Sequence, residues 1–288
     1  MKKQNIYSIQ RFCWYGVGLV LFFTPFTLYQ KTLLFLAGSE RFPSIHTMCL
    51  RTPLLYIVNG NFTHILTISF FSFMIVLGVA FVFGPFFCGR FCATGALPEY
   101  LSRLMPRKWQ MDWYQTVNPI PIRYGFLAGF LLSPLLGGTI AHAYCNFNLT
   151  EKLLYAGMER DIGMLTSTTI ITAFLWLGLF GLMTKGGRGF CNFLCPVGAL
   201  QSIVHSIGAT FNFTYKIQKN SQRCTGCQVC VETCPMGSWQ GASITHEIHN
   251  CITCRQCEFV CPTGAISFCR GNIEEQVKKE AGFHDTKM

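Results

Sequence analysis

Residues 224–235 read CTGCQVCVETCP, and residues 251–262 read CITCRQCEFVCP. Both stretches have the spacing Cys-x2-Cys-x2-Cys-x3-Cys-Pro, which decides the fold of this part of the chain. With this spacing, three close thiolates can surround one face of a cubane iron–sulfur cluster, and the fourth cysteine can bind the neighbouring cluster. The repeated pattern therefore predicts two cubane clusters that exchange one ligand.

The spacing also assigns the expected ligands. We predict one [4Fe–4S] cluster on the first three cysteines of the first copy and the last cysteine of the second, which are Cys224, Cys227, Cys230 and Cys261. We predict the other cluster on Cys251, Cys254, Cys257 and Cys234. Because such clusters carry electrons one at a time, residues 216–270 are expected to form a ferredoxin-like electron-transfer domain of the α+β type.

Cys-x2-Cys pairs have two other common uses. They hold structural zinc, and in secreted domains they form disulfides. Zinc takes four ligands, which leaves the third cysteine at this spacing and the repeated Cys-Pro unexplained. Gly226 and Gly264 fit the cluster interpretation, because the chain has to turn tightly around a bulky group. The pattern therefore favours iron–sulfur clusters.

The remainder of the chain is unusually apolar. Of the 288 residues, 50% are hydrophobic and only 12% are charged, and the mean hydropathy is +0.34. These values are too apolar for an ordinary soluble domain. We predict an α-helical membrane protein with four transmembrane helices, because four uncharged stretches approach or exceed the roughly 17 to 25 residues that cross a bilayer. The stretches are residues 12–28, 65–87, 124–141 and 165–183.

Lysine and arginine residues set the expected orientation. They gather before the first stretch and between the second and third, at Lys2, Lys3, Arg11, Arg90, Arg103, Arg107, Lys108 and Arg123. By the positive-inside rule, both termini face the cytoplasm of a bacterial inner membrane, where reducing conditions protect thiolates. The net charge of +10 does not indicate nucleic acid, because the basic residues are scattered without a dense patch or an aromatic platform.

A second repeat relates the two halves of the apolar region. Residues 84–97 read GPFFCGRFCATGAL and residues 187–200 read GRGFCNFLCPVGAL, with seven of the fourteen positions identical. Two helical hairpins with approximate twofold symmetry about the membrane normal would bring the two Cys-x3-Cys motifs together. We expect Cys88 and Cys92 on one helical face, and likewise Cys191 and Cys195. Spacing alone leaves these four open as redox thiols, as ligands of an additional metal centre or as small packing residues.

These features divide the chain into five parts. The first hairpin is expected over residues 1–97, a cytoplasmic interfacial linker over 98–123 and the second hairpin over 124–200. The two-cluster domain follows over residues 216–270, and a polar tail over 271–288.

The combination of four spans, two Cys-x3-Cys motifs followed by Gly-Ala-Leu, and a two-cluster tail resembles the NapH/MauN family of membrane-bound ferredoxins, with NosR and CcoG as more distant relatives. The likeness covers residues from about 12 to 270. Cys191, Cys195 and Pro196 match the family motif Cys-x3-Cys-Pro, whereas Ala93 replaces the proline in the first copy.

The resemblance implies a quinol-oxidising membrane subunit. It would carry electrons from quinol through [4Fe–4S] clusters to a periplasmic or membrane-associated iron–sulfur protein and a periplasmic reductase. The likeness to CcoG implies an alternative, in which the protein supplies electrons for the maturation of a metal centre, for example by reducing copper.

Several further residues are weaker candidates. His64 and His142 lie at ends of predicted spans, where they fit proton relays, haem ligands or ordinary interfacial residues. His246 and His249 flank the second cysteine run and fit either tuning of the cluster or solvated loops. Cys49 and Cys145 are both expected on the outer side, where an oxidising compartment permits a disulfide.

Overall fold

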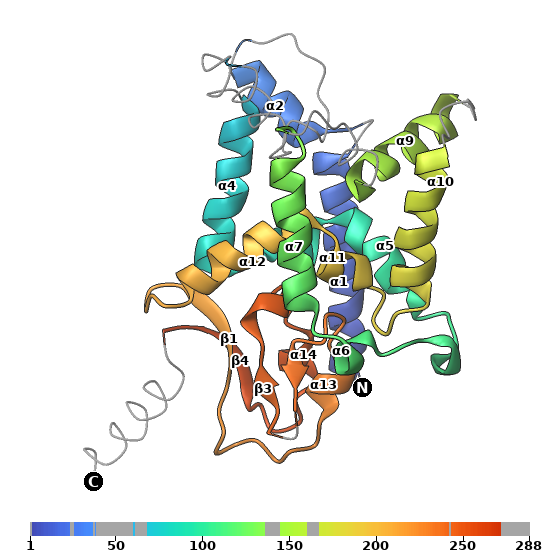
Figure 1. Ribbon diagram of the computed structural model, residues 1–288. Coiled ribbons are helices and arrows are strands. Elements are labelled where there is room, and N and C mark those ends of the chain that lie inside the picture. Colours follow the sequence, from blue (N-terminus) through green and yellow to red (C-terminus); the bar gives the residue numbers. More distant parts are fainter. Residues whose placement is uncertain are drawn as a thin grey trace.

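The computed structural model describes residues 2–23, 26–36, 38, 60, 68–135, 145–159, 167–241 and 243–271. Most of these residues are helical, and the strands occur in the C-terminal part of the chain. Figure 1 shows two layers, with a bundle of upright helices above and a small mixed domain below. We call these the helical layer (the described residues from 2 to 208) and the ferredoxin module (the described residues from 215 to 271).

Four helical segments stand upright in the helical layer (Figure 1). They are α1 (Lys2–Phe22), α4 (Ile68–Phe83), α7 (Pro119–Leu132) and α10 (Ser167–Ala173), which continues as the π-helical segment η6 (Phe174–Leu182). The start of α7 illustrates the local signals. The Asn118 side chain accepts a hydrogen bond from the Ile120 amide at 3.1 Å, and Pro119 occupies the first helical position, where no backbone donor is needed.

Shorter helices connect these segments. They are α2 (Leu28–Leu36), η3 (Phe87–Phe91, π-helical), α5 (Ala93–Ser102), η4 (Arg107–Trp109), α6 (Trp113–Thr116), α9 (Asn146–Glu159), α11 (Gly189–Phe193) and α12 (Pro196–Gly208). The predicted linker 98–123 therefore contains the end of α5, η4, α6 and the start of α7. Tyr114 of α6 donates a hydrogen bond to Pro235 O at 3.2 Å, so this linker contacts the ferredoxin module.

The predicted membrane spans are matched only in part by the helices. Across the described ranges, no helix has both the length and the apolar character that a membrane crossing requires. Each predicted span also includes residues outside those ranges, namely 24–25, 65–67, 136–141 and 165–166. The first helix starts at Lys2 and ends at Phe22, shortly before Pro25.

The ferredoxin module contains two small antiparallel sheets and two short helices. Strand β1 (Tyr215–Lys219) pairs with β4 (Ile266–Arg270), and β2 (Trp239–Gln240) pairs with β3 (Thr245–His246). The helices α13 (Val229–Thr233) and α14 (Gln256–Val260) each follow a cysteine pair, and the 3-10 turn η7 (Ile248–Asn250) precedes the second run. The first and last strands of the module thus lie side by side and close it around the cysteines.

The start of α1 fixes the module to the helical layer. The Tyr7 hydroxyl donates to Cys254 O at 2.6 Å, and the Tyr7 ring stacks on Phe259 of α14 with 3.8 Å between centroids. A second contact comes from α11, where Asn192 Nδ2 donates to Met236 O at 3.0 Å. These buried contacts place the beginning of the chain and the module at the same end of the helical layer (Figure 1).

Candidate functional site

The first predicted ligand set lines a single cavity in the ferredoxin module. This first cavity is bordered by Cys224, Cys227, Cys230 and Cys261, with apolar walls from Val229, Ile244 and Ile266. Cys230 is buried, whereas Cys227 is exposed. The first cavity therefore lies close to the outer surface of the module.

The second predicted set lines a second cavity. Its cysteines are Cys234, Cys251, Cys254 and Cys257, and its other walls include Ile217, Met236, Trp239 and His246. Cys251, Cys254 and Cys257 are all buried. Cys234 of the first run thus lines the cavity of the second run, and Cys261 of the second run lines the cavity of the first.

The two cysteine runs have matching backbone conformations. Gln228 and Arg255 precede α13 and α14 with left-handed φ angles of 58° and 60°. Gly237 and Gly264, each three residues after the last cysteine of a run, have φ angles of 60° and 62°. Gly226 is also left-handed, with a φ of 73°, as expected for a tight turn between cysteines.

Backbone amides contact the sulfurs at matching positions. The Ser238 amide donates to Cys234 Sγ at 3.3 Å, and the Ala265 amide donates to Cys261 Sγ at 3.2 Å. Hydrogen bonds to sulfur stabilise the thiolate form and raise the reduction potential of a bound cluster. Both cavities therefore combine four cysteines, apolar walls and amide donors, which is the donor set that a [4Fe–4S] cluster needs.

The Cys-x3-Cys motifs differ from the expectation that each pair lies on one helix. Cys88 lies in η3 and Cys191 in α11, but Cys92 and Cys195 are extended residues at the N-caps of α5 and α12. Their φ and ψ angles are −73° and 93° at Cys92, and −75° and 112° at Cys195. The extended backbone ends one helix and starts the next, so each motif forms a corner.

The same corner forms with either residue after the second cysteine. Ala93 and Pro196 both occupy the first position of the following helix, and the N-cap angles before them agree closely. Proline is favoured at this position but alanine is also a good helix former. The departure of the first copy from Cys-x3-Cys-Pro therefore leaves the turn intact. Gly84 and Gly187, which begin the two copies, also share left-handed φ angles of 75° and 68°.

The two motifs meet inside the helical layer. The Gly95 amide donates to Cys92 Sγ at 3.4 Å, and a Cβ atom on Gly95 would lie 3.3 Å from Cys191 Sγ. Burial, followed by the nearby Cys191 thiol, raises the pKa of Cys92 to about 12, and the same two causes raise the pKa of Cys195 to about 12. Without a ligand, these groups are therefore neutral thiols at physiological pH.

A buried ion-pair network lies beside the motifs. Glu99 of α5 is 1% exposed and binds Arg11 Nη1 at 3.0 Å and Arg188 Nε at 2.8 Å. Burial alone would raise the pKa of Glu99, but Arg11 and Arg188 lower it to about 2. Arg188 also donates to Cys88 O at 3.1 Å. No sequence pattern singled out Glu99, and Arg11 was interpreted only as an orientation signal, whereas Arg188 lies three residues before Cys191.

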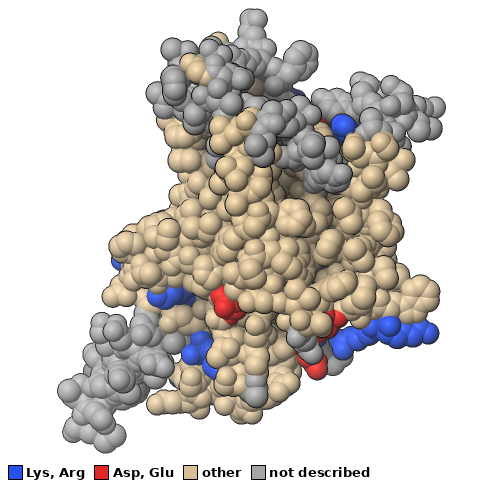
Figure 2. All heavy atoms as spheres, viewed as in Figure 1, with Lys and Arg blue, Asp and Glu red and all other residues tan. Residues whose placement is uncertain are grey.

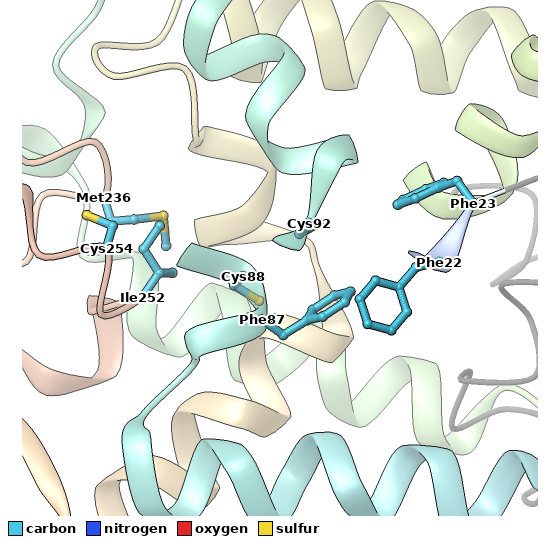
Figure 3. Close-up of a cluster of buried hydrophobic side chains, with 8 residues drawn as sticks. All are labelled: Phe22, Phe23, Phe87, Cys88, Cys92, Met236, Ile252 and Cys254. Carbon is cyan, nitrogen blue, oxygen red and sulfur yellow. The ribbon is translucent and has the colours of Figure 1, made fainter. Parts of the chain in front are cut away.

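The motifs also contact the second cavity. Cys88 and Cys92 belong to one buried cluster with Met236, Ile252 and Cys254, and Figure 3 shows these side chains with Cys88 lying between the module and Phe87. A Cβ atom on Gly89 would overlap Ile252 O and would lie 3.2 Å from Cys254 N. Glycine at residue 89 therefore allows the two backbones to touch.

The weaker candidates have mixed outcomes. His246 lines the second cavity and packs on Trp239, with 4.6 Å between ring centroids. His249 Nδ1 lies 2.6 Å from the Tyr124 hydroxyl, so it is engaged in a side-chain contact. His64, His142 and Cys49 lie outside the described residues. Among the residues that are described, no three His, Cys, Asp or Glu side chains converge on a position for a single metal ion.

Two protein-family models match the chain. The model described as a 4Fe-4S dicluster domain covers residues 216–279, and the one described as a 4Fe-4S binding domain covers residues 65–112 and 168–213. Ferredoxin-type protein NapH of Escherichia coli is 27% identical over 183 residues, which are 61% of this chain and 58% of NapH. The methylamine utilization ferredoxin-type protein MauN of Methylorubrum extorquens is 32% identical over 168 residues, which are 56% of this chain and 51% of MauN.

The chain is thus a distant homologue of the NapH/MauN-type ferredoxins. It carries [4Fe–4S] clusters and is a ferredoxin-type electron-transfer protein related to NapH and MauN. An uncharacterized protein of Methanocaldococcus jannaschii is 29% identical over 209 residues, which are 72% of each chain. No solved structure matches. The chain spans little more than half the length of the NapH and MauN proteins that it matches.

Proposed function

We propose that this protein is the membrane-anchored, quinol-oxidising subunit of an electron-transfer system. The proposal rests on the position of the second cavity. This cavity lies between the first cavity, which is near the surface of the module, and the helical layer. Cys224, Cys227, Cys230 and Cys261 would hold one [4Fe–4S] cluster, and Cys234, Cys251, Cys254 and Cys257 the other. When bound, these clusters accept and release single electrons, so two of them match the two electrons that a quinol gives up.

The outer faces of the upright helices support a membrane location. Large apolar side chains are exposed on α4, α7 and η6, where Phe71 is 56%, Phe126 is 52% and Phe174 is 63% exposed. Exposed apolar area of this extent is typical of surfaces that contact lipid or another protein. Figure 2 shows no charged side chain across the middle of the face in view, and charges appear where the helical layer meets the module.

The arrangement of the chain ends supports the proposed orientation. The first turns of α1 contact α14 of the module through Tyr7, so the basic start of the chain and the ferredoxin module would share one side of the membrane. By the positive-inside rule this side is the cytoplasm. The exposed Cys227 edge of the first cavity would face a soluble or membrane-associated iron–sulfur partner.

The proposal is tested on membranes prepared without oxygen from cells that produce the full chain. We expect EPR signals of reduced [4Fe–4S] clusters after addition of a quinol analogue, and loss of one of them in Cys251→Ala. Cys13→Ser changes an exposed cysteine outside both cavities and should keep the wild-type spectrum. Clusters that dithionite reduces but quinol leaves oxidised would refute quinol oxidation and would favour the maturation function.

A further inference from the structure

We propose that Cys88, Cys92, Cys191 and Cys195 hold a third iron–sulfur cluster of the [4Fe–4S] class, located between the two halves of the helical layer. The inference extends the proposed function, because it adds a redox centre next to the second cavity. Three features of the described residues carry it: the convergence of two helix N-termini, an excess of buried positive charge and direct packing against the module.

Two of the four cysteines lie where helices begin. Cys92 and Cys195 are the N-cap residues of α5, with 10 residues, and α12, with 13 residues. Free amides and the helix dipole make such ends favourable for negative charge. Gly95 and Gly198 occupy the same position in the two repeats, and each faces a guanidinium group. A Cβ atom on Gly95 would overlap Arg188 Nη1, and one on Gly198 would lie 3.1 Å from Arg123 Nη2.

Arg123 provides the most specific observation. It is 2% exposed, and its Nη1 donates to His249 O at 2.5 Å, while its buried Nε has no hydrogen-bond partner. No ion pair to Arg123 occurs within the described part of the chain. A buried charge without a counter-charge is costly, so the site requires an anion near this guanidinium.

The neighbouring ion-pair network does not supply that negative charge. Glu99 is shared by the buried Arg11 and Arg188, so this group also has more positive than negative charge. Among the described ion pairs, neither Arg123 nor the second arginine beside Glu99 has a carboxylate of its own. An oxidised cubane with four thiolates carries about two negative charges, which would balance Arg123 and the excess beside Glu99.

The proposed site adjoins the second cavity. Gly89, next to Cys88, packs on the backbone of Ile252 and Cys254, and Met236 and Cys254 share a buried cluster with Cys88 and Cys92. Met236 and Cys254 both line the second cavity. A cluster at this site would therefore be able to exchange one electron with the second cluster, one becoming oxidised as the other is reduced.

Iron and acid-labile sulfide in the full chain, purified without oxygen, test the proposal. We expect about twelve irons per chain in the wild type and about eight in Cys191→Ala, with both ferredoxin clusters still visible by EPR. Cys13→Ala is the matched control and should retain the wild-type content, because Cys13 is exposed and outside the site. About eight irons in the wild type, with no change in Cys191→Ala, would overturn the third cluster and leave the proposed function intact.

A second variant tests the charge argument without removing a ligand. Arg123→Gln deletes the positive charge beside the site, so reduction, which adds negative charge there, becomes less favourable. We expect one cluster to shift to a lower reduction potential while the other two change little, and no shift in Lys108→Gln, an exposed control. An unchanged set of potentials in Arg123→Gln, or zinc in place of iron in the four-cysteine site, would contradict the proposal.

The two proposals fail in different ways. A wild-type chain that contains only about four irons, all lost in Cys191→Ala, would refute the ferredoxin assignment and keep the helical site. A chain with three clusters that quinol does not reduce would refute quinol oxidation alone.

Discussion

The ferredoxin module and the helical layer position cysteines in two different ways. In the module, the four cysteines of each cavity come mainly from one short run, and matching left-handed residues such as Gln228 and Arg255 shape the chain around them. In the helical layer, two motifs about one hundred residues apart form a corner each and meet through Gly95. Local spacing is sufficient for the first arrangement, whereas the second depends on distant charges such as Arg11, Glu99 and Arg188.

The largest loss of stability is expected when the buried ion pairs of Glu99 with Arg11 and Arg188 are broken. Glu99→Gln leaves the buried Arg11 and Arg188 without a counter-charge, which should reduce the free energy of unfolding by about 3–5 kcal/mol. Asp112→Asn removes the partner of Lys185 in a half-exposed pair, with side chains 27% and 32% exposed, and should cost about 0–1 kcal/mol. Denaturant unfolding of both variants in detergent measures the difference. Equal losses of unfolding free energy in the two variants would show that burial of the Glu99 ion pairs does not increase their contribution to stability.

The next largest loss of stability is expected at the contact between the helical layer and the ferredoxin module. Gly89→Ala places a Cβ atom against Ile252 O and should separate the backbones at a cost of about 1–3 kcal/mol. Gly125→Ala is the control, because no atom lies within 4 Å of the added Cβ and α7 is helical there. It should be neutral or stabilising by about 0.4–1 kcal/mol. Melting temperatures compare the two, and a Gly89→Ala protein as stable as Gly125→Ala would contradict the close packing.

The smallest loss of stability is expected from removing single hydroxyls, one at the contact between the two regions and one within the helical layer. Tyr7→Phe keeps the stacking on Phe259 but loses the hydrogen bond to Cys254 O, which should cost about 0.5–1.5 kcal/mol. Tyr100→Phe loses a bond to Ser8 O within the helical layer and should cost a similar amount. Only Tyr7→Phe should change the EPR spectrum of the second cluster. A spectral change in Tyr100→Phe would mean that the two regions are coupled more broadly.

The sequence was most informative where structure is encoded locally. The cysteine spacing groups the same two sets of four cysteines that line the two cavities, because three cysteines of each set lie within seven residues of one another. The internal repeat predicted that the Cys-x3-Cys motifs would meet, but it missed the corners at Cys92 and Cys195. Helical periodicity alone cannot show where one helix ends and another begins when alanine, a good helix former, follows the break.

Long-range partners could not be predicted in the same way. Arg123 was interpreted as a topology signal, yet its side chain is buried beside Gly198 and bonded to His249 O in the ferredoxin module. Glu99 lies in a stretch predicted to be an interfacial linker, where a carboxylate is unremarkable until Arg11 and Arg188 approach it. Such contacts join residues more than 80 positions apart, so composition and spacing contain no trace of them.

The exchange of Cys234 and Cys261 between the two cavities has a consequence for biosynthesis. The first cavity lacks its fourth sulfur until residue 261 has left the ribosome, although its other three cysteines are complete by residue 230. The second cavity needs Cys234 of the first run and is complete at residue 257. Clusters held by these two sets would therefore be inserted only after most of the second run has been synthesised, and a chain that stops between residues 257 and 261 would lack one sulfur of the first set.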